Sequence, residues 1–322
     1  MGAIRLLIPE LREGSYFPSL LEPRRRSEHA LVSVIQEAYV AGVSTRKVDR
    51  LAKALGMDGI SRSQVSRVCQ ELSAIVEKWR QRSLEDEPIV YLWLDGTTLE
   101  VRENERVVSV TAVVAVGVTA DGRRTILGFD VGASESRAFW PSFLRSLVAR
   151  GLDGVLLVIS DAHEGLKEAI AATMSEATWQ RCRVHYMRNV LGRVKKGDAD
   201  EVMNAIRSIF AQTDVNDARR QLRTVADRLR KRHPDAADKL EEAEADLLAY
   251  SVFPRSHWRK IWSNNLLERL LREVKRRTNV VGIFPNRDAV IRLVGMVLLE
   301  QDEEWQAKRR YMSEASMQGL TE

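Results

Sequence analysis

Hydrophobic positions in residues 28–79 recur at helical spacing, in three runs that are separated by Gly42 and Gly56. The third run opens with Ser61-Arg-Ser-Gln64, a sequence typical of a capping box at the start of a helix. Short helices joined by glycine-containing turns predict a helix-turn-helix arrangement. A small helical module that only packs is the alternative interpretation, because the same spacing serves both.

Sheet-forming patterns begin at residue 89. Ile89-Val-Tyr-Leu-Trp-Leu-Asp95 is a short apolar run that ends in an acid. Residues 106–118 are rich in Val and Thr, and residues 125–131 form a further strand pattern after a turn at Asp121-Gly122. These three runs predict three strands that follow one another as a meander.

A second apolar run that ends in an acid, Val155-Leu-Leu-Val-Ile-Ser-Asp161, lies between two helical patterns. The helical patterns cover residues 134–150, where Pro141 indicates a kink or a later start, and residues 164–174. Strands followed by alternating helices and a buried strand predict an α/β fold with a mixed sheet and flanking helices.

Residues 192–258 are helical in pattern and heavily charged, with almost no strand signal, which predicts an all-α insertion. A helix then begins near Asn264 or Asn265, either of which can cap it. Its spacing predicts one buried face and, beside it, a second face with Glu268, Arg272 and Lys275. Residues 290–311 form a last amphipathic helix.

Composition narrows the class of protein. The chain has 322 residues, 44% of them hydrophobic and 30% charged, as in an ordinary globular protein. The net charge of +5 modestly favours a polyanionic partner. Two distant cysteines exclude a disulfide framework and are typical of a reducing cytoplasm. No apolar run is long enough for a membrane span or a signal peptide, so we expect a cytoplasmic protein without a membrane partner.

Two groups of polar side chains are candidates for contact with double-stranded DNA. Arg62, Gln64 and Arg67 lie on the predicted exposed face near the start of the third helix, where such side chains can reach phosphates and base edges. The second group extends along the later helix and can neutralise backbone phosphates; it comprises Arg272, Lys275, Arg276 and Arg277.

Asp95, Asp161 and Glu268 are the candidate catalytic and metal-binding residues. Two of these acids end predicted strands, where open α/β sheets place their ligand sites, and the third lies on a helix that can pack on the sheet. Carboxylate oxygens suit Mg²⁺, or Mn²⁺ as an alternative, and two such ions can catalyse phosphoryl transfer on nucleic acid. The alternative is a surface helix in which Glu268 and Arg272 form an ordinary ion pair.

Six segments together resemble the Mutator-type transposases of bacterial insertion sequences, members of the DDE group with an RNase H-like core. They are Tyr91-Leu-Trp-Leu-Asp95-Gly, Val158-Ile-Ser-Asp161-Ala-His163-Glu-Gly-Leu-Lys, Trp179-Gln-Arg-Cys182-Arg-Val-His185, Glu268-Arg-Leu-Leu-Arg-Glu-Val-Lys275-Arg-Arg, Val280-Val-Gly-Ile-Phe-Pro-Asn286 and Glu300-Gln-Asp-Glu-Glu-Trp305. The resemblance implies an RNase H-like mixed sheet with a helical insertion. It also assigns the metal-binding triad to Asp95, Asp161 and Glu268.

The resemblance indicates supporting roles for three further residues. Cys182 and His185 match the Cys-x-x-His motif of the family, which suggests positioning of DNA or support of the active site. A buried cysteine beside a hydrogen-bonded histidine is an equal alternative. His163 could steady the metal site or contact DNA, or it could simply begin a helix.

We therefore expect five segments along the chain. They are a leader or linker at 1–27, a helical helix-turn-helix-like DNA-binding domain at 28–85, the first part of the catalytic core at 86–191, the helical insertion at 192–258, and the second part of the core at 259–322. The sequence departs from the family in two respects. Members usually have a longer N-terminal portion, and they commonly have Asn at the position of Leu271.

The resemblance implies a DNA transposase that works as a homodimer or larger multimer, because two element ends must be joined. In this hypothesis a strand at the element's end is hydrolysed with the help of Mg²⁺, and the freed 3′ hydroxyl attacks target DNA. Two alternatives stay open at this point. One is an RNase H-like nuclease that cleaves without joining, and the other is a non-catalytic DNA-binding remnant of a transposase.

Overall fold

A computed structural model describes residues 35–43, 47–50, 69–86, 88–133 and 138–320 of the chain. Contacts divide the chain into two compact units, Met1–Leu72 and Ser73–Glu322. Across the described ranges, no helix combines the length and the apolar character that are needed to cross a bilayer.

The described residues of the smaller unit are helical at 35–40 and again at 47–50. The first helix ends where the sequence predicts, since Gly42 has a φ of +77°, a left-handed conformation that glycine adopts readily after a helix. The helix-turn-helix stays a prediction, because its third helix is only partly described. Outside the described residues lie its predicted DNA-contacting side chains, Arg62, Gln64 and Arg67.

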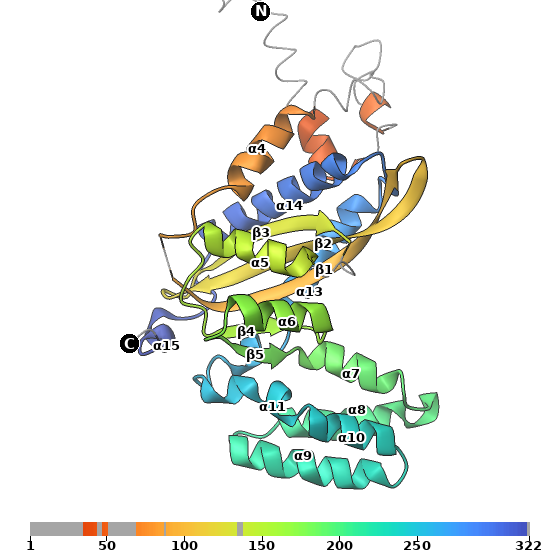
Figure 1. Cartoon of the computed structure of the whole chain (residues 1–322), viewed down its shortest axis with the longest axis vertical. Coiled ribbons are helices and arrows are strands. Elements are labelled where there is room, and N and C mark those ends of the chain that lie inside the picture. The colour runs from red at the N-terminus through yellow and green to blue at the C-terminus, as the bar shows by residue number, and fades with distance from the viewer. Residues whose placement is uncertain (1–34, 44–46, 51–68, 87, 134–137, 321–322) are drawn as a thin grey trace, which may run out of the picture. The chain divides into compact units, whose positions relative to one another are not determined.

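A six-stranded sheet organises the larger unit (Figure 1). Its strands are β1 Ile89–Glu103, β2 Arg106–Thr119, β3 Arg124–Gly132, β4 Leu157–Ser160, β5 Thr178–Arg181 and β6 Ile283–Phe284. The order is β3-β2-β1-β4-β5, and the short β6 pairs with β1. The β1–β2 and β2–β3 pairs are antiparallel, whereas β1–β4 and β4–β5 are parallel. The predicted mixed α/β sheet is therefore confirmed.

Helices connect and cover the strands (Figure 1). They are α4 Glu71–Arg80, α5 Phe139–Ala149, α6 Glu164–Thr173, α7 Arg183–Leu191, α8 Ala199–Phe210, α9 Val215–Arg230, α10 Pro234–Glu242, α11 Glu244–Leu247, α12 Trp258–Ile261, α13 Asn265–Thr278, α14 Arg287–Ala307 and α15 Glu314–Met317, with 3-10 turns η2 Lys196–Asp198 and η3 Ala249–Val252. Pro141 lies in the first turn of α5, where its missing N–H costs nothing, so the later of the two predicted starts is correct.

Side chains of the strands alternate between two faces, and this alternation decides which helices they meet. Leu92 of β1 and Val158 of β4 pack with α5 and α6 in one apolar cluster. Tyr91 and Trp93 belong to the opposite face. There α13 packs on β1, and α14 packs on β3. Asp95 continues the Trp93 side of this alternation, so it faces the helix that carries the third candidate acid.

The structure corrects the predicted end of the first strand. β1 does not stop at Asp95 but continues to Glu103, because the β-forming residues that follow pair with β2 along its whole length. Asn104 and Glu105, with φ of 47° and 64°, turn the chain back into β2, and positive φ at both positions is typical of a type I′ hairpin. Asp95 is therefore an internal strand residue rather than a terminal one.

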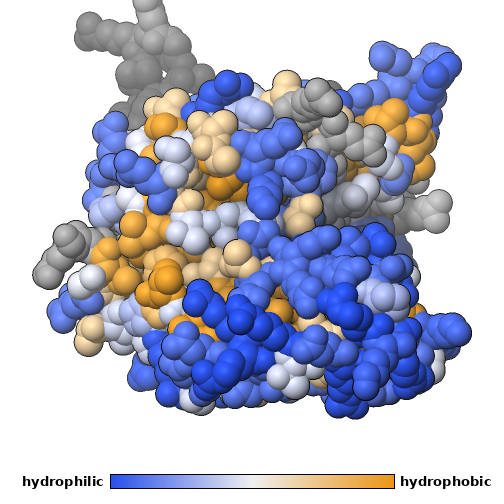
Figure 2. Space-filling view, turned by 60° about the horizontal axis from the view of Figure 1, so that its bottom comes forward, coloured by the Kyte–Doolittle hydropathy of each residue, from blue (hydrophilic) through white to orange (hydrophobic). Residues whose placement is uncertain are grey.

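The predicted helical insertion is present as α8, α9, α10 and α11, which follow α7 and precede α12. Leu222, Val225 and Leu229 of α9 are buried, as their spacing predicts. The outer positions are largely charged and pair across neighbouring helices, for example Arg228 with Glu201 at 2.8 Å. These helices lie at the bottom of Figure 1. Figure 2 turns that side toward the viewer and shows that hydrophilic residues cover much of its surface.

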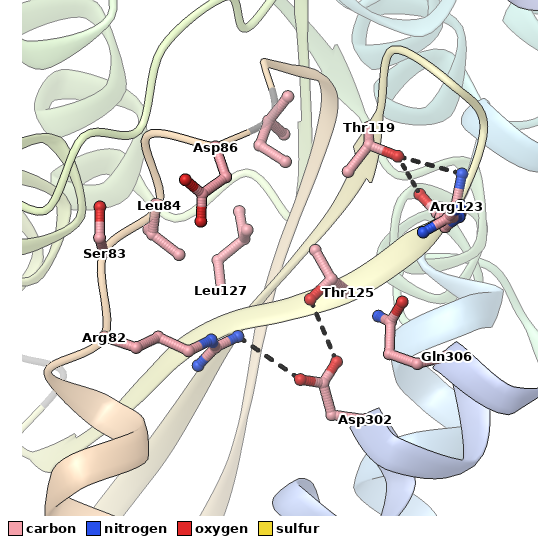
Figure 3. A pocket seen from close by; sticks show the side chains of 11 residues that line it. Arg82, Ser83, Leu84, Asp86, Thr119, Arg123, Thr125, Leu127, Asp302 and Gln306 are labelled. Carbon is pink, nitrogen blue, oxygen red and sulfur yellow. Dashed lines mark hydrogen bonds and ion pairs between the residues drawn. The ribbon is translucent and has the colours of Figure 1, made fainter.

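A buried carboxylate joins α4, β3 and α14. Asp302 of α14 accepts a hydrogen bond from the Ile126 N–H at 2.7 Å and one from the Thr125 hydroxyl at 3.2 Å, and it pairs with Arg82 at 3.5 Å. Figure 3 shows these side chains lining a pocket near the start of β1. Arg82 and Asp302 pair with each other here, and the pocket lies at the other end of the β1–β4 pairing from the candidate acids. We therefore interpret it as a structural junction between α14 and the sheet.

Substituting Asp302→Ala should lower the free energy of unfolding by about 2 kcal/mol, because its donors would remain buried without an acceptor. Chemical denaturation at neutral pH measures this change. The matched control is Glu303→Ala, since Glu303 is an exposed acid next to it on the same helix. Equal stability of the two variants would contradict the role of the junction.

Candidate active site

The parallel pairing of β1 with β4 brings two of the candidate acids together. Trp93 pairs with Ile159, and the sequence separation of this pair, 66 residues, is also that of Asp95 and Asp161. Asp161 directly follows the end of β4, so continuing this register would bring it beside Asp95, and the two carboxylates interact electrostatically. Asp95 lies two residues after Trp93, and Asp161 lies two residues after Ile159. Because side chains two residues apart along an extended chain lie on the same face, both acids are expected on the face on which α13 packs.

Strand β5 and helix α7 complete this edge of the sheet. The Cys182 N–H continues the β4–β5 ladder by donating to the Ser160 carbonyl at 2.7 Å. Cys182 then occupies the N-cap position of α7. His185, in the first turn of α7, interacts electrostatically with Asp95 and Asp161. Three consecutive strands of the sheet thus deliver an acid, an acid and a cysteine to one place.

Burial dominates the electrostatics of Asp95 and raises the pKa of its carboxyl to about 6, and the negative charge of Asp161 adds to the rise. The charge of His185 lowers the pKa, as do hydrogen bonds from the Gly96 N–H at 2.8 Å and from the Asn264 side chain. The two carboxylates are therefore close enough to repel each other in a partly desolvated place. Such a pair attracts a cation.

His185 supplies a positive charge beside this pair. Hydrogen bonding with Cys182 is the largest cause that raises the pKa of His185 to about 9; burial opposes the rise, and the charges of Asp95 and Asp161 add to it. These interactions therefore favour the protonated form of the imidazole. Cys182 is fully buried, and its Sγ accepts a hydrogen bond from the Asn264 N–H at 3.3 Å. The Cys-x-x-His motif thus lies against the two acids.

Glu268 lies in the first turn of α13, on the helix that covers the same face of the sheet. Its Oε1 forms an ion pair with Nη1 of Arg188 on α7, at 3.0 Å. The Glu268 side chain is 19% exposed and that of Arg188 is 59% exposed, so the pair lies at the edge of the site. The structure thus brings Asp95 and Asp161 together and leaves Glu268 paired with an arginine.

The donor atoms of the site suit a hard divalent cation. Asp95 and Asp161 offer carboxylate oxygens on one face. Oδ1 of Asn264 is buried and accepts no hydrogen bond from the part of the chain that the structure describes, and Oε1 of Glu268 is engaged only by the ion pair with Arg188. Within the same residues, no three His, Cys, Asp or Glu side chains are arranged to hold one ion. A shared ion with three carboxylate ligands therefore requires Glu268 to exchange Arg188 for the metal.

The cations of α13 differ in their surroundings. Arg276 and Arg277 both pair with Glu273 at 2.7 Å, and Arg277 also contacts Glu300. These pairs lower the pKa of Glu273 to about 2, with the Arg276 hydrogen bond as the largest cause. Since Glu268 pairs with Arg188, both acids of α13 are engaged. Three exposed cations of this helix then have no acid of α13 as a partner, namely Arg269, Arg272 and Lys275.

His163 is exposed at the N-cap position of α6, two residues after Asp161. Its Nδ1 accepts a hydrogen bond from the Leu166 N–H at 3.3 Å, so the side chain has a local structural task. Its ring also lies 6.0 Å from the ring of Trp140. A further role toward metal or DNA stays a prediction.

Sequence reasoning missed two side chains that contact the candidate acids. Arg188 lies one helical turn after His185 on the same face of α7, and this spacing is the signal that could have found it. Asn264 stands at the N-cap position of α13, but within the described residues its side chain makes no capping bond. It donates instead to the Leu94 carbonyl of β1 at 3.1 Å, a contact that no local pattern encodes.

The known proteins that are similar in sequence to this chain are transposases. The family model described as "Transposase, Mutator family" matches residues 1–308. The transposase for insertion sequence element IS1081 of Mycobacterium tuberculosis is 49% identical over 312 residues, 97% of this chain and 75% of that protein. The transposase for insertion sequence element IS256 in transposon Tn4001 of Staphylococcus aureus is 37% identical over 316 residues, 97% of this chain and 81% of that protein.

Among solved structures, the chain aligns with one titled "Drosophila P element transposase strand transfer complex". The alignment has a TM-score of 0.35 and 13% identity, and it covers 88% of this chain and 81% of that chain. Similarity at this level is too low to support a common fold or function. The family assignment therefore rests on the sequence comparisons alone.

Replacing Asp95→Asn should stabilise the protein in metal-free buffer at pH 7 by about 1 kcal/mol, because the amide removes a buried charge that Asp161 repels. Thermal unfolding in the presence of a chelator measures the change. Glu100→Gln is the control, since Glu100 is an exposed acid on the same strand. If Asp95→Asn were less stable than the wild type without metal, the carboxylate would not be under electrostatic strain.

Proposed function

The chain belongs to the Mutator family of transposases, and from this premise we propose that it cleaves and joins DNA strands at the ends of an insertion sequence, with divalent metal ions held by Asp95, Asp161 and Glu268. The observation that carries this proposal is the parallel β1–β4 pairing, which runs up to Trp93 and Ile159, two residues before each acid, together with the electrostatic interaction of Asp95 with Asp161. The expected ion is Mg²⁺, with Mn²⁺ as an alternative, and two ions fit the chemistry.

Divalent ions bound here would activate the attacking oxygen and stabilise the leaving oxygen of the phosphodiester. The residues of the chain prepare this site. The half-buried, mutually repelling carboxylates of Asp95 and Asp161 favour occupation by a cation. Glu268 would join them when it leaves Arg188, and Arg188 would then be free to bind a phosphate oxygen.

The wider fold supports the same proposal. Three antiparallel strands followed by two parallel ones, with helices on both faces, agree with an RNase H-like core. Double-stranded DNA is the expected substrate, and the exposed Arg272 and Lys275 on α13 are candidates for phosphate contact. Because two ends must be brought to one target, we propose that the protein works as a homodimer or larger multimer.

Substituting Asp161→Asn should abolish Mg²⁺-dependent cleavage and joining of labelled DNA ends, while DNA binding stays within a factor of about two. The amide keeps the shape of the side chain but loses the charge that holds a cation. A strand-transfer assay with the DNA that flanks the gene measures joining, and a binding assay in a chelator measures affinity. The control is Glu168→Gln, since Glu168 is an exposed acid on α6.

The assay separates the proposal from its rivals. Cleavage without joining by the wild type would identify a nuclease. Binding without either reaction at any Mg²⁺ concentration would identify a non-catalytic remnant. If Asp161→Asn joined DNA ends as well as the wild type does, the Asp161 carboxylate would not be required for the reaction, and the proposed mechanism would be wrong.

Replacing Arg272→Ala and Lys275→Ala together should weaken DNA binding and make it less dependent on salt. Each lost phosphate contact should reduce the slope of log K against log salt by about 0.9. A titration of DNA affinity between low and physiological salt measures this slope. The control is Arg230→Ala, because Arg230 already pairs with Asp238 and Glu241. An unchanged slope in the double variant would show that α13 does not face the DNA backbone.

A further inference from the structure

Asn264 occupies an unusual place for a polar residue. It stands directly before α13 and is fully buried, with an exposed fraction of 0%. A buried amide normally has all its hydrogen-bonding groups satisfied, because an unsatisfied group costs about 1–3 kcal/mol. An asparagine at a helix start usually uses its side chain to cap the helix, but within the described residues this one makes no such bond. Its contacts therefore serve another purpose.

Three hydrogen bonds connect Asn264 to the elements that carry Asp95, Glu268 and the Cys-x-x-His motif. Its side-chain Nδ2 donates to the carbonyl of Leu94, the residue before Asp95, at 3.1 Å. Its main-chain N–H donates to the Sγ of Cys182 at 3.3 Å. Its carbonyl accepts from the N–H of Glu268 at 2.8 Å. One residue thus joins β1, the start of α7 and the first turn of α13.

The neighbours of Asn264 anchor the same segment independently. The carbonyl of Ser263 accepts a hydrogen bond from the indole N–H of Trp93 at 3.2 Å. The carbonyl of Trp262 accepts one from the N–H of Arg183 at 3.1 Å. The path of the chain before α13 therefore keeps two supports when the Asn264 side chain is removed. A variant at this position should still fold, with its main effect on the relative placement of the acids.

The side-chain amide of Asn264 has a second N–H donor besides the one that binds the Leu94 carbonyl. Nδ2 has two hydrogens, and the Leu94 carbonyl takes one of them. The Asn264 amide also interacts with the carboxylate of Asp95 and favours its charged form. The donors of the amide thus orient the strand and the acid together. A residue of the same shape without donors could do neither.

We propose that Asn264 is a positioning residue that sets the spacing of Asp95 and Glu268 through its side-chain amide donors, and so prepares the carboxylates for divalent cations. This inference rests on the proposed function, because it presumes that these acids bind metal. In phosphoryl transfer a displacement of about 1 Å at the reacting groups can cost roughly 100-fold in rate. Loss of a residue that orients metal ligands typically costs about 10- to 100-fold in metal affinity or activity.

The test compares three variants with the wild type. Asn264→Ala removes both the donors and the carbonyl group of the side chain. Asn264→Asp keeps the shape and an oxygen but removes the donors. Asn265→Ala is the matched control, because Asn265 is the exposed neighbour in the first turn of α13. Mn²⁺ binding is measured by isothermal titration calorimetry on the full chain without DNA, so the readout does not depend on turnover.

Both Asn264 variants should bind Mn²⁺ about 10- to 100-fold more weakly than the wild type. Their kcat for cleavage should fall, their KM for DNA should stay unchanged, and raised Mn²⁺ should restore part of the rate. Amide hydrogen exchange should be faster at Glu268, and the melting temperature should fall by several degrees while unfolding stays cooperative, because the Leu94 carbonyl loses its donor. The Asn265→Ala control should match the wild type in each measurement.

Two results would overturn the inference. Wild-type Mn²⁺ affinity in Asn264→Ala would show that the side chain does not position the acids. Wild-type affinity in Asn264→Asp would show that an oxygen at this position matters and the donors do not. If Asn264→Ala fails to fold, the isosteric Asn264→Asp decides the question. Failure of the proposed function looks different, because then Asp161→Asn would bind Mn²⁺ as the wild type does.

Discussion

The register between β1 and β4 is the constraint on which the candidate site depends. Because side chains alternate between the two faces of a strand, a slip of one residue would turn Asp161 away from Asp95 and into the apolar cluster with α5 and α6. Specific contacts on the two faces oppose such a slip, since Leu92 packs in the cluster with α5 and α6 whereas the Trp93 indole donates to the Ser263 carbonyl at 3.2 Å. The packing of the core thus fixes the spacing of the two acids.

Keeping two carboxylates in a partly buried place is unfavourable, and the surrounding structure supplies positive charge to oppose it. Helix α7 brings His185 to the acid pair and Arg188 to Glu268. Each acid of the candidate site therefore has a cation of the chain nearby in the absence of metal. This arrangement stabilises the fold while leaving the carboxylates able to exchange these cations for divalent ions.

The connection between sheet and helix is equally specific. The segment Trp262–Asn264 meets β1 and α7 through main-chain and side-chain hydrogen bonds, and α13 begins directly after it. The orientation of α13 is thus set at the end that carries Glu268, and its basic end extends away from that anchor. In contrast, the charged groups around Asp302 are paired among themselves, which assigns that region to stability.

Local sequence determined much of this protein. The period of apolar residues predicted the mixed sheet, the helical insertion, and the α13 face whose Leu267, Leu270 and Val274 are buried. Its motifs also predicted the family that the comparisons identify. Only the tertiary structure decided that β1 continues beyond Asp95, that Thr178–Arg181 is a strand, and that Glu268 meets Arg188. The reason is physical: periodicity reports which face of an element is buried, whereas strand pairing and ion pairs join residues far apart in sequence, and their partners depend on the packed fold.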